Sequence, residues 1–163
     1  MWLDGTPHWK GKQMDQTALP IVLLDKCNVH DVIDKDRMSR YWPVIKMAIK
    51  YLIINGPYTQ EDRWEEEQGF TPFTLATEVA GLLAGADLAE QNNEYEVAAY
   101  CRETADYWNS EIENWKYVTD TSLAKKYEVD GYYIRINPYD DIPADKLADK
   151  TIDLKNNKAK EEK

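Results

Sequence analysis

Paired carboxylates beside a tryptophan are the residues of this chain best suited to chemistry. The connector 56–72 contains Trp64 followed by Glu65, Glu66 and Glu67, and it separates two segments with helical patterns. A carboxyl group against an apolar wall such as an indole ring can have the raised pKa that general acid catalysis requires. The connector is also longer than a helical bundle needs, and such loops are often functional. The alternative is a solvent-exposed acidic loop, which composition alone favours because runs of charge usually lie in water.

Composition restricts the classes of ligand. With 163 residues the chain has the length of one domain, and it carries six Trp and eleven Tyr but only two Phe. Trp and Tyr combine an apolar face with a polar group and therefore suit interfaces and sugar-stacking surfaces. A net charge of -10 argues against nucleic acid and anionic membrane partners. Since no stretch approaches the roughly 18 apolar residues of a membrane span, we expect no membrane segment.

Other catalytic and metal-binding patterns are missing from the sequence. Cys27 and Cys101 lie in helical patterns without metal-ligand spacing, and the two histidines, His8 and His30, are far apart. We therefore predict no metal site, no cofactor and no Ser-His-Asp triad, and we expect the cysteines to be small buried thiols. The N-terminal residues have neither a basic nor an apolar signal region, and the localisation stays open.

The acidic connector is positioned by four predicted helices. The third is apolar almost all the way round, which predicts burial on most of its sides, and Gly81 and Gly85 would allow neighbouring helices to approach closely. Thr71 followed by Pro72 is a typical N-cap and first helical position. The predicted helices span 15–26, 39–54, 72–89 and 94–118.

The character of the chain changes after residue 119. The segment 132–136 has the aromatic and β-branched composition of a short strand. Residues 139–156 are predicted to be irregular or weakly helical. We assign residues 1–154 to one domain and 155–163 to a charged tail that we expect to be disordered.

Three motifs connect the chain to a known family. Residues 9–20 (WKGKQMDQTALP), 60–66 (QEDRWEE) and 69–76 (GFTPFTLA) resemble, in order and spacing, the prokaryotic glucoamylases and glucodextranases of glycoside hydrolase family 15. The segments 132–136 and 147–155 are also similar to the later part of that catalytic domain. The resemblance covers nearly the whole chain.

The resemblance implies an all-α fold built from helical hairpins of an (α/α)6 toroid, here a partial barrel of about four main helices. It implies inverting hydrolysis of α-glucosidic bonds in an α-glucan or oligosaccharide, which uses an acid and a base roughly 6.5–9.5 Å apart. By motif match Glu65 would be the general acid. The residues implied in substrate binding or in holding the acid are Trp9, Asp15, Asp62, Trp64 and Glu66, of which the tryptophans would form apolar walls.

The chain also departs from the family pattern. The catalytic base and an N-terminal substrate-binding pair have no match in it, so the sequence corresponds to a middle fragment of the catalytic domain. Helices taken from a closed toroid would leave apolar faces exposed, and large apolar patches mark interfaces. We therefore expect a homo-oligomer or a complementing chain. Arg135 is expected to bind a carboxylate of the acidic connector rather than a substrate.

Two alternative functions remain open at this point. The first is a non-catalytic carbohydrate-binding or interaction module that uses the same helical scaffold. The second is an enzyme of a different class that has repurposed the loop containing Glu65 and Glu66.

Overall fold

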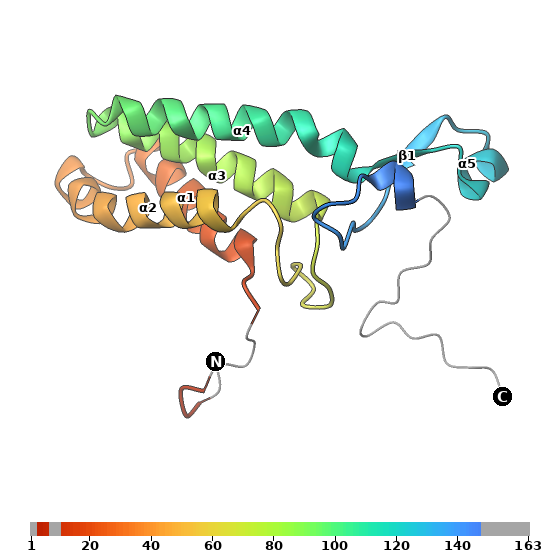
Figure 1. The fold of residues 1–163 in the computed structure, drawn as a ribbon. Helices are drawn as coiled ribbons and strands as arrows, with labels where there is room; N and C mark the ends of the chain where they lie inside the picture. Colours follow the sequence, from red (N-terminus) through yellow and green to blue (C-terminus); the bar gives the residue numbers. More distant parts are fainter. Residues whose placement is uncertain (1–2, 7–10, 148–163) are drawn as a thin grey trace.

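Four long helices lie side by side and form the body of the protein (Figure 1). The structure is a computed structural model that describes residues 3–6 and 11–147. The predicted all-α class is confirmed, and the helices have nearly the expected bounds. They are α1 (Met14–Val29), α2 (Lys35–Asn55), α3 (Pro72–Gln91) and α4 (Tyr95–Lys116).

Helix α3 is the centre of the core, as its sequence predicts. It contacts each of the other three long helices, and its buried residues extend from Thr74 to Ala89. Gly81 lies directly against α1, because a Cβ atom at this position would be only 3.1 Å from the Cβ of Ala18. A larger residue would force the two helices apart, so the small residues of α3 set the separation between α1 and α3.

The starts of the helices follow from their capping residues. Thr71 caps α3 by accepting a hydrogen bond from the backbone N–H of Thr74, as predicted. The predicted start of α2 at residue 39 is wrong, because the helix begins four residues earlier at Lys35, where Asp34 caps it by accepting from the N–H of Arg37 at 2.8 Å. Pro20 lies inside α1.

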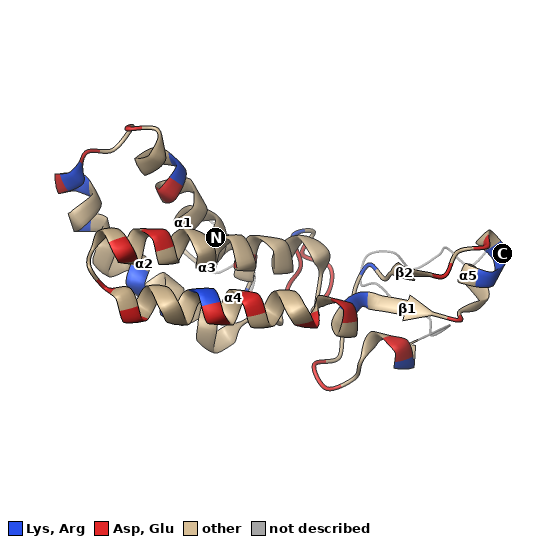
Figure 2. Cartoon of the chain, turned by 90° about the horizontal axis from the view of Figure 1, so that it is seen from above, with Lys and Arg blue, Asp and Glu red and all other residues tan. Residues whose placement is uncertain are grey.

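The segment after α4 differs most from the prediction. Helix α4 ends at Lys116 because the next residues form strand β1 (Tyr117–Thr119), which pairs antiparallel with β2 (Gly131–Tyr133). The predicted strand 132–136 is therefore wrong beyond Tyr133. The short helix α5 (Ser122–Tyr127) and the 3-10 turn η1 (Ala144–Leu147) were not predicted. Figure 2 shows β1, β2 and α5 extending from one end of the helical body.

The acidic connector is an ordered hairpin. Thr59 and Gly69 exchange backbone hydrogen bonds of 3.3 and 2.8 Å, and the N–H of Asp62 donates to the carbonyl of Glu67 at 2.8 Å. We call residues 59–69 the acidic hairpin. Because its two sides are hydrogen-bonded to each other, the residues between Asp62 and Glu67 form a tight turn at its tip.

The base of the hairpin is attached to the segment after β2. Phe70 and Asn137 exchange backbone hydrogen bonds of 2.8 and 3.1 Å. Gly69 has a φ of +143°, and a Cβ atom here would lie 2.3 Å from the carbonyl oxygen of Asn137. Glycine is therefore required by both its backbone conformation and the closeness of the second segment.

A buried lysine connects the same region to α4. The Nζ of Lys116, which is 1% exposed, donates to the carbonyl of Phe70 at 2.9 Å. Burial lowers the pKa of Lys116 to about 7. The end of α4, the base of the hairpin and the segment after β2 therefore form one connected unit.

The remaining predictions concern the domain boundary, the cysteines and membrane-spanning segments. The predicted domain boundary at residue 154 and the tail 155–163 lie outside the described residues. Cys101 is buried as expected, whereas Cys27 is half-buried, and both are free thiols. Within residues 3–6 and 11–147, none of the helices has the length and apolar character needed to cross a membrane.

Candidate active site

The carboxylate of Asp62 organises the tip of the acidic hairpin. It is 3% exposed, and its Oδ1 accepts hydrogen bonds from the backbone N–H groups of Trp64 and Glu66 at 3.1 and 3.0 Å. Its backbone carbonyl accepts from the N–H of Glu65 at 2.8 Å and from the Gln13 side chain at 3.2 Å. Asp residues form such turns because their short side chain reaches backbone donors two to four positions later. Asp62 therefore fixes the path of the chain on both sides of Glu65.

Arg135 adds a second restraint from a distant part of the sequence. Its guanidinium donates to Asp62 Oδ2 at 3.3 Å and to Glu66 Oε2, with which it forms two ion pairs. The predicted contact between Arg135 and a carboxylate of the acidic connector is confirmed. One guanidinium thus connects the segment after β2 to both ends of the turn.

Glu65 lies at the tip of the hairpin and differs from Asp62 and Glu66 in its backbone conformation and in its side-chain contacts. Its φ of 58° is in the left-handed region, which is uncommon for a residue with a side chain and is often associated with function. The side chain is half-buried and has no hydrogen bond or ion pair within the described part of the chain. The carboxyl group of Glu65 is therefore available to a ligand, whereas those of Asp62 and Glu66 are occupied.

Trp64 lies next to Glu65 with its ring largely in solvent. The side chain is 64% exposed, and the guanidinium of Arg63 lies 4.9 Å from its ring centroid and 4.1 Å from that of Phe73. An indole ring held from one side by a cation presents its other surface outward. Trp9, the second predicted aromatic wall, lies outside the described residues.

Asp15, which the sequence predicts to line the substrate site, lies near Asp62 and Arg63 of the hairpin. It lies in the first turn of α1, is 5% exposed, and its Oδ1 has no hydrogen-bond partner among the described residues. Burial raises the pKa of Asp15, with a smaller raising effect from Asp62 and a lowering effect from Arg63. Asp15 therefore lies close enough to Asp62 and Arg63 of the hairpin to interact with them electrostatically.

Sequence reasoning missed a second buried acid, Glu78 of α3. It is fully buried, and neither of its carboxyl oxygens has a hydrogen-bond partner in the described part of the chain. Its Oε1 lies against Gly56, beside the ring of Trp108. Burial raises the pKa of Glu78 to about 8, and the nearby carboxylate of Asp15 contributes to the increase. Glu78 is therefore mostly protonated at neutral pH. A carboxyl residue in a helix without a polar face is the signal that could have revealed it.

The acids do not form an evident metal site. Among the described residues, no group of three or more His, Cys, Asp or Glu side chains is arranged to hold a metal ion. The arrangement holds the backbone on both sides of Glu65 through Asp62 and Arg135, and among the described residues the Glu65 carboxyl group has no hydrogen-bond or ion-pair partner.

Comparisons with known proteins agree with the predicted resemblance. The family model for glycosyl hydrolases family 15 matches residues 2–159. A glucoamylase from Clostridium sp. (strain G0005) is 39% identical over 144 residues, which are 88% of this chain and 19% of that protein. The crystal structure of a bacterial glucoamylase complexed with acarbose matches with a TM-score of 0.71 and 37% identity, covering 85% of this chain and 19% of that one. The chain thus spans about a fifth of the length of these relatives. The resemblance and the glucoamylase-like helical fold are confirmed.

We predict that Arg135 keeps the tip of the hairpin in place. Arg135→Gln removes the charged hydrogen bonds to Asp62 and Glu66, and such bonds are worth about 1.5 kcal/mol or more. The backbone amides of Trp64 and Glu66 should then exchange with solvent roughly tenfold faster, as measured by hydrogen exchange.

Arg102 offers a matched control for this variant, because it also bridges two carboxylates, those of Asp87 and Glu90. Arg102→Gln should leave the exchange of the hairpin amides unchanged. Unchanged exchange of these amides in Arg135→Gln would contradict the restraint that we assign to Arg135.

We also predict that Glu78 makes stability depend on pH. In the folded protein the pKa of Glu78 is about 8, whereas in the unfolded chain its pKa returns to the ordinary value of 4.5. Between these two pH values the folded state binds one more proton than the unfolded chain. The free energy of unfolding therefore falls by about 1.4 kcal/mol for each pH unit as the pH rises.

Urea unfolding at several pH values tests this slope. Relative to wild type, Glu78→Gln should gain stability steadily between pH 5 and pH 8. Glu103→Gln, at an exposed position of α4, should follow the wild-type curve. A pH-independent difference between wild type and Glu78→Gln would mean that Glu78 is ionised in the folded state.

Proposed function

This chain belongs to glycosyl hydrolases family 15, and on that basis we propose that it takes part in hydrolysing α-glucosidic bonds of an α-glucan or oligosaccharide, with Glu65 as the general acid. The observation that carries the proposal is the state of the three acids at the hairpin tip. Asp62 and Glu66 are bound by Arg135, whereas Glu65 has no partner within the described residues. The glucoamylase relatives support α-glucosides as the substrate class.

The reaction we propose is an inverting displacement. The carboxylic acid of Glu65 donates its proton to the glycosidic oxygen as the bond between that oxygen and the anomeric carbon breaks. A water molecule attacks the opposite face of the sugar and gives its proton to an adjacent carboxylate base, which lies roughly 6.5–9.5 Å from the carboxyl group of the general acid. The products are a sugar with inverted anomeric configuration and a shortened glucan. We propose that the base comes from outside these 163 residues, since the Arg135 ion pairs occupy Asp62 and Glu66.

The remaining acids and aromatics receive supporting roles in the proposal. Asp62 and Glu66 hold the backbone on both sides of Glu65, and Glu66 also faces the sugar hydroxyl groups. Trp64 and Trp9 form apolar walls, and Asp15 borders the proposed substrate site from the start of α1. The hydrogen bonds of Asp62 and the solvent-facing ring of Trp64 support the roles of these two residues.

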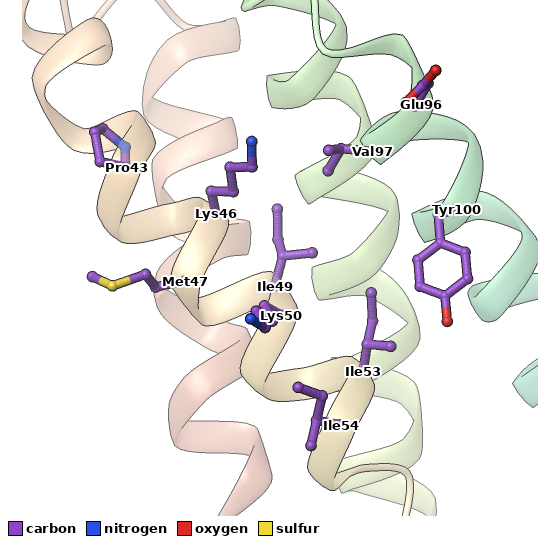
Figure 3. Close-up of a pocket in the computed structure, with 10 residues that line it drawn as sticks. All are labelled: Pro43, Lys46, Met47, Ile49, Lys50, Ile53, Ile54, Glu96, Val97 and Tyr100. Carbon is purple, nitrogen blue, oxygen red and sulfur yellow. The ribbon is translucent and has the colours of Figure 1, made fainter.

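An apolar surface on α2 indicates how the site is completed. Val44, Met47, Tyr51 and Ile54 are exposed and spaced three or four residues apart, so they form one stripe along the helix. Met47 and Ile54 also line a groove of about 790 Å³ between α2 and α4, shown in Figure 3. The relatives are about five times longer than this chain. We propose that further helices of the same family domain, supplied from outside these residues, cover the stripe.

We predict that sugar cleavage depends on Glu65. Because general acid catalysis typically contributes 10²–10⁴-fold, Glu65→Gln should reduce the release of glucose from maltose or isomaltose by about a hundredfold or more. The wild-type chain alone should be slow, since the base is missing, and sodium azide should accelerate it as an external nucleophile. The measurement is the rate of sugar cleavage with and without azide.

Glu128 provides a control for this variant, because it is an exposed glutamate that also has a left-handed backbone, with a φ of 54°. Glu128→Gln should retain the wild-type rate. Equal rates for wild type and Glu65→Gln would eliminate the catalytic role. Sugar binding without any turnover would instead select the carbohydrate-binding module, and cleavage of esters alone would select an enzyme of another class.

We predict that the isolated chain associates through the stripe on α2. In the absence of the covering helices, burial of the exposed apolar side chains drives self-association. Light scattering should give an average mass that rises with concentration, and Met47→Lys with Ile54→Lys should reduce it to that of one chain. The paired control Asn109→Lys with Asn114→Lys adds the same charge at exposed positions of α4 and should keep the association. A monomeric wild type at all concentrations would contradict the proposal.

A further inference from the structure

A polar hollow lies beside the base of the acidic hairpin, away from its tip. Its volume is about 460 Å³. Gln60 and Gln68 line it from the two sides of the hairpin, Lys12 and Asn55 from the ends of the neighbouring segments, and Tyr139 from the loop after β2. Glu65, Arg135 and Asp62 do not line it, so the hollow is distinct from the proposed catalytic tip.

The walls of the hollow are fixed by hydrogen bonds. The backbone carbonyl of Lys12 accepts from the N–H groups of Gln60 and Glu61, and the N–H of Lys12 donates to the side chain of Gln60. On the opposite side, the hydroxyl of Tyr58 donates to the carbonyl of Pro138 at 2.8 Å. The hollow is therefore preformed, which lowers the entropic cost of binding a ligand.

The loop that carries Tyr139 is also held by hydrogen bonds. The buried side chain of Asn137 accepts from the N–H of Tyr139 at 3.0 Å and donates to the carbonyl of Ile142 at 2.8 Å. The ring of Tyr139 is nevertheless 44% exposed. The backbone of Tyr139 is therefore held in place, and its partly exposed ring lines the hollow.

Two polar side chains of the hollow are exposed to solvent. The amide of Gln68 and the carboxylate of Asp140 have no hydrogen-bond partner among the described residues, although both line the hollow. An amide offers donors and acceptors, and a carboxylate accepts hydrogen bonds from neighbouring hydroxyl groups. Together with an exposed aromatic ring, these groups match a neutral ligand that carries many hydroxyl groups and apolar C–H faces.

The charge of the hollow disfavours an anionic ligand. Among the described residues Lys12 is the one cation that lines the hollow, and its Nζ donates to Asn55 Oδ1. The carboxylate of Asp140 offsets this charge, and the whole chain carries a net charge of -10. A phosphate or acidic peptide would therefore find less favourable electrostatics than a sugar.

We propose that this hollow is an accessory binding site for α-linked glucose oligosaccharides, separate from the point of cleavage. The choice of α-linked glucose rests on the proposed function, whereas the preference for a neutral sugar rests on the hollow itself. Tyr139 stacks on a sugar ring while Gln68 and Asp140 bind its hydroxyl groups. A glucan segment held here lies beside the same hairpin that carries Glu65.

Titration of the whole chain with maltopentaose tests the proposal by calorimetry. Tyr139→Ala should weaken binding about tenfold, as expected for loss of an aromatic contact, and Gln68→Ala should weaken it as well. Tyr139→Phe should bind like wild type because it retains the ring. Tyr107→Ala, at an exposed tyrosine of α4, is the matched control and should not change the affinity.

Three outcomes separate this inference from the proposed function. Glu65→Gln should bind maltopentaose like wild type, and loss of binding in that variant would place the sugar at the hairpin tip and overturn the inference. Equal affinities of wild type, Tyr139→Ala and Gln68→Ala would also overturn it. Binding through Tyr139 without any Glu65-dependent cleavage would support the accessory site while rejecting the catalytic proposal.

Discussion

The buried carboxylate of Asp62 is the interaction on which the candidate site depends. An ionised carboxylate removed from water is costly unless hydrogen bonds or an opposite charge compensate it. Here two backbone N–H groups and Arg135 do so. These donors come from the hairpin tip and from the segment after β2, so satisfying one carboxylate determines how both segments meet. The left-handed backbone at Glu65 costs on the order of 1 kcal/mol, and the surrounding hydrogen bonds offset it.

Local signals explain which parts of the fold could be predicted. Thr71 and Pro72 mark the start of α3 because capping involves neighbouring residues only, and the apolar character of α3 directly reflects its central position. The end of α4 and the limits of β2 depend instead on distant contacts. Lys116 reaches the carbonyl of Phe70, and Asn137 pairs with Phe70 across more than sixty positions of the sequence. No periodic pattern near residue 116 or 134 contains that information.

In the candidate site, too, the features that depend on neighbouring residues could be predicted, whereas those that depend on distant contacts were harder to predict. The motif around Asp62, Glu65 and Glu66 was visible in the sequence because it is contiguous, and the contact with Arg135 followed from charge complementarity. Glu78 was overlooked because its significance comes from burial against Gly56 and Trp108, which lie in other elements. Its fully apolar helical surroundings were evident in the sequence, and a carboxyl group there had either to find a partner or to remain neutral.

The exposed stripe on α2 and the lack of a partner for Glu65 among the described residues have a common explanation under the proposed function. A general acid acts best where water is excluded and charges are held by fixed groups, but Trp64, next to Glu65 at the hairpin tip, is 64% exposed to solvent. The helices that would cover Met47 and Ile54 belong to the same closed architecture that would face the tip. The packing of these helices would then both bury the apolar stripe and place the carboxylate of the catalytic base opposite Glu65. Completing the hydrophobic core would assemble the catalytic pair, which couples folding of the larger body to its chemistry.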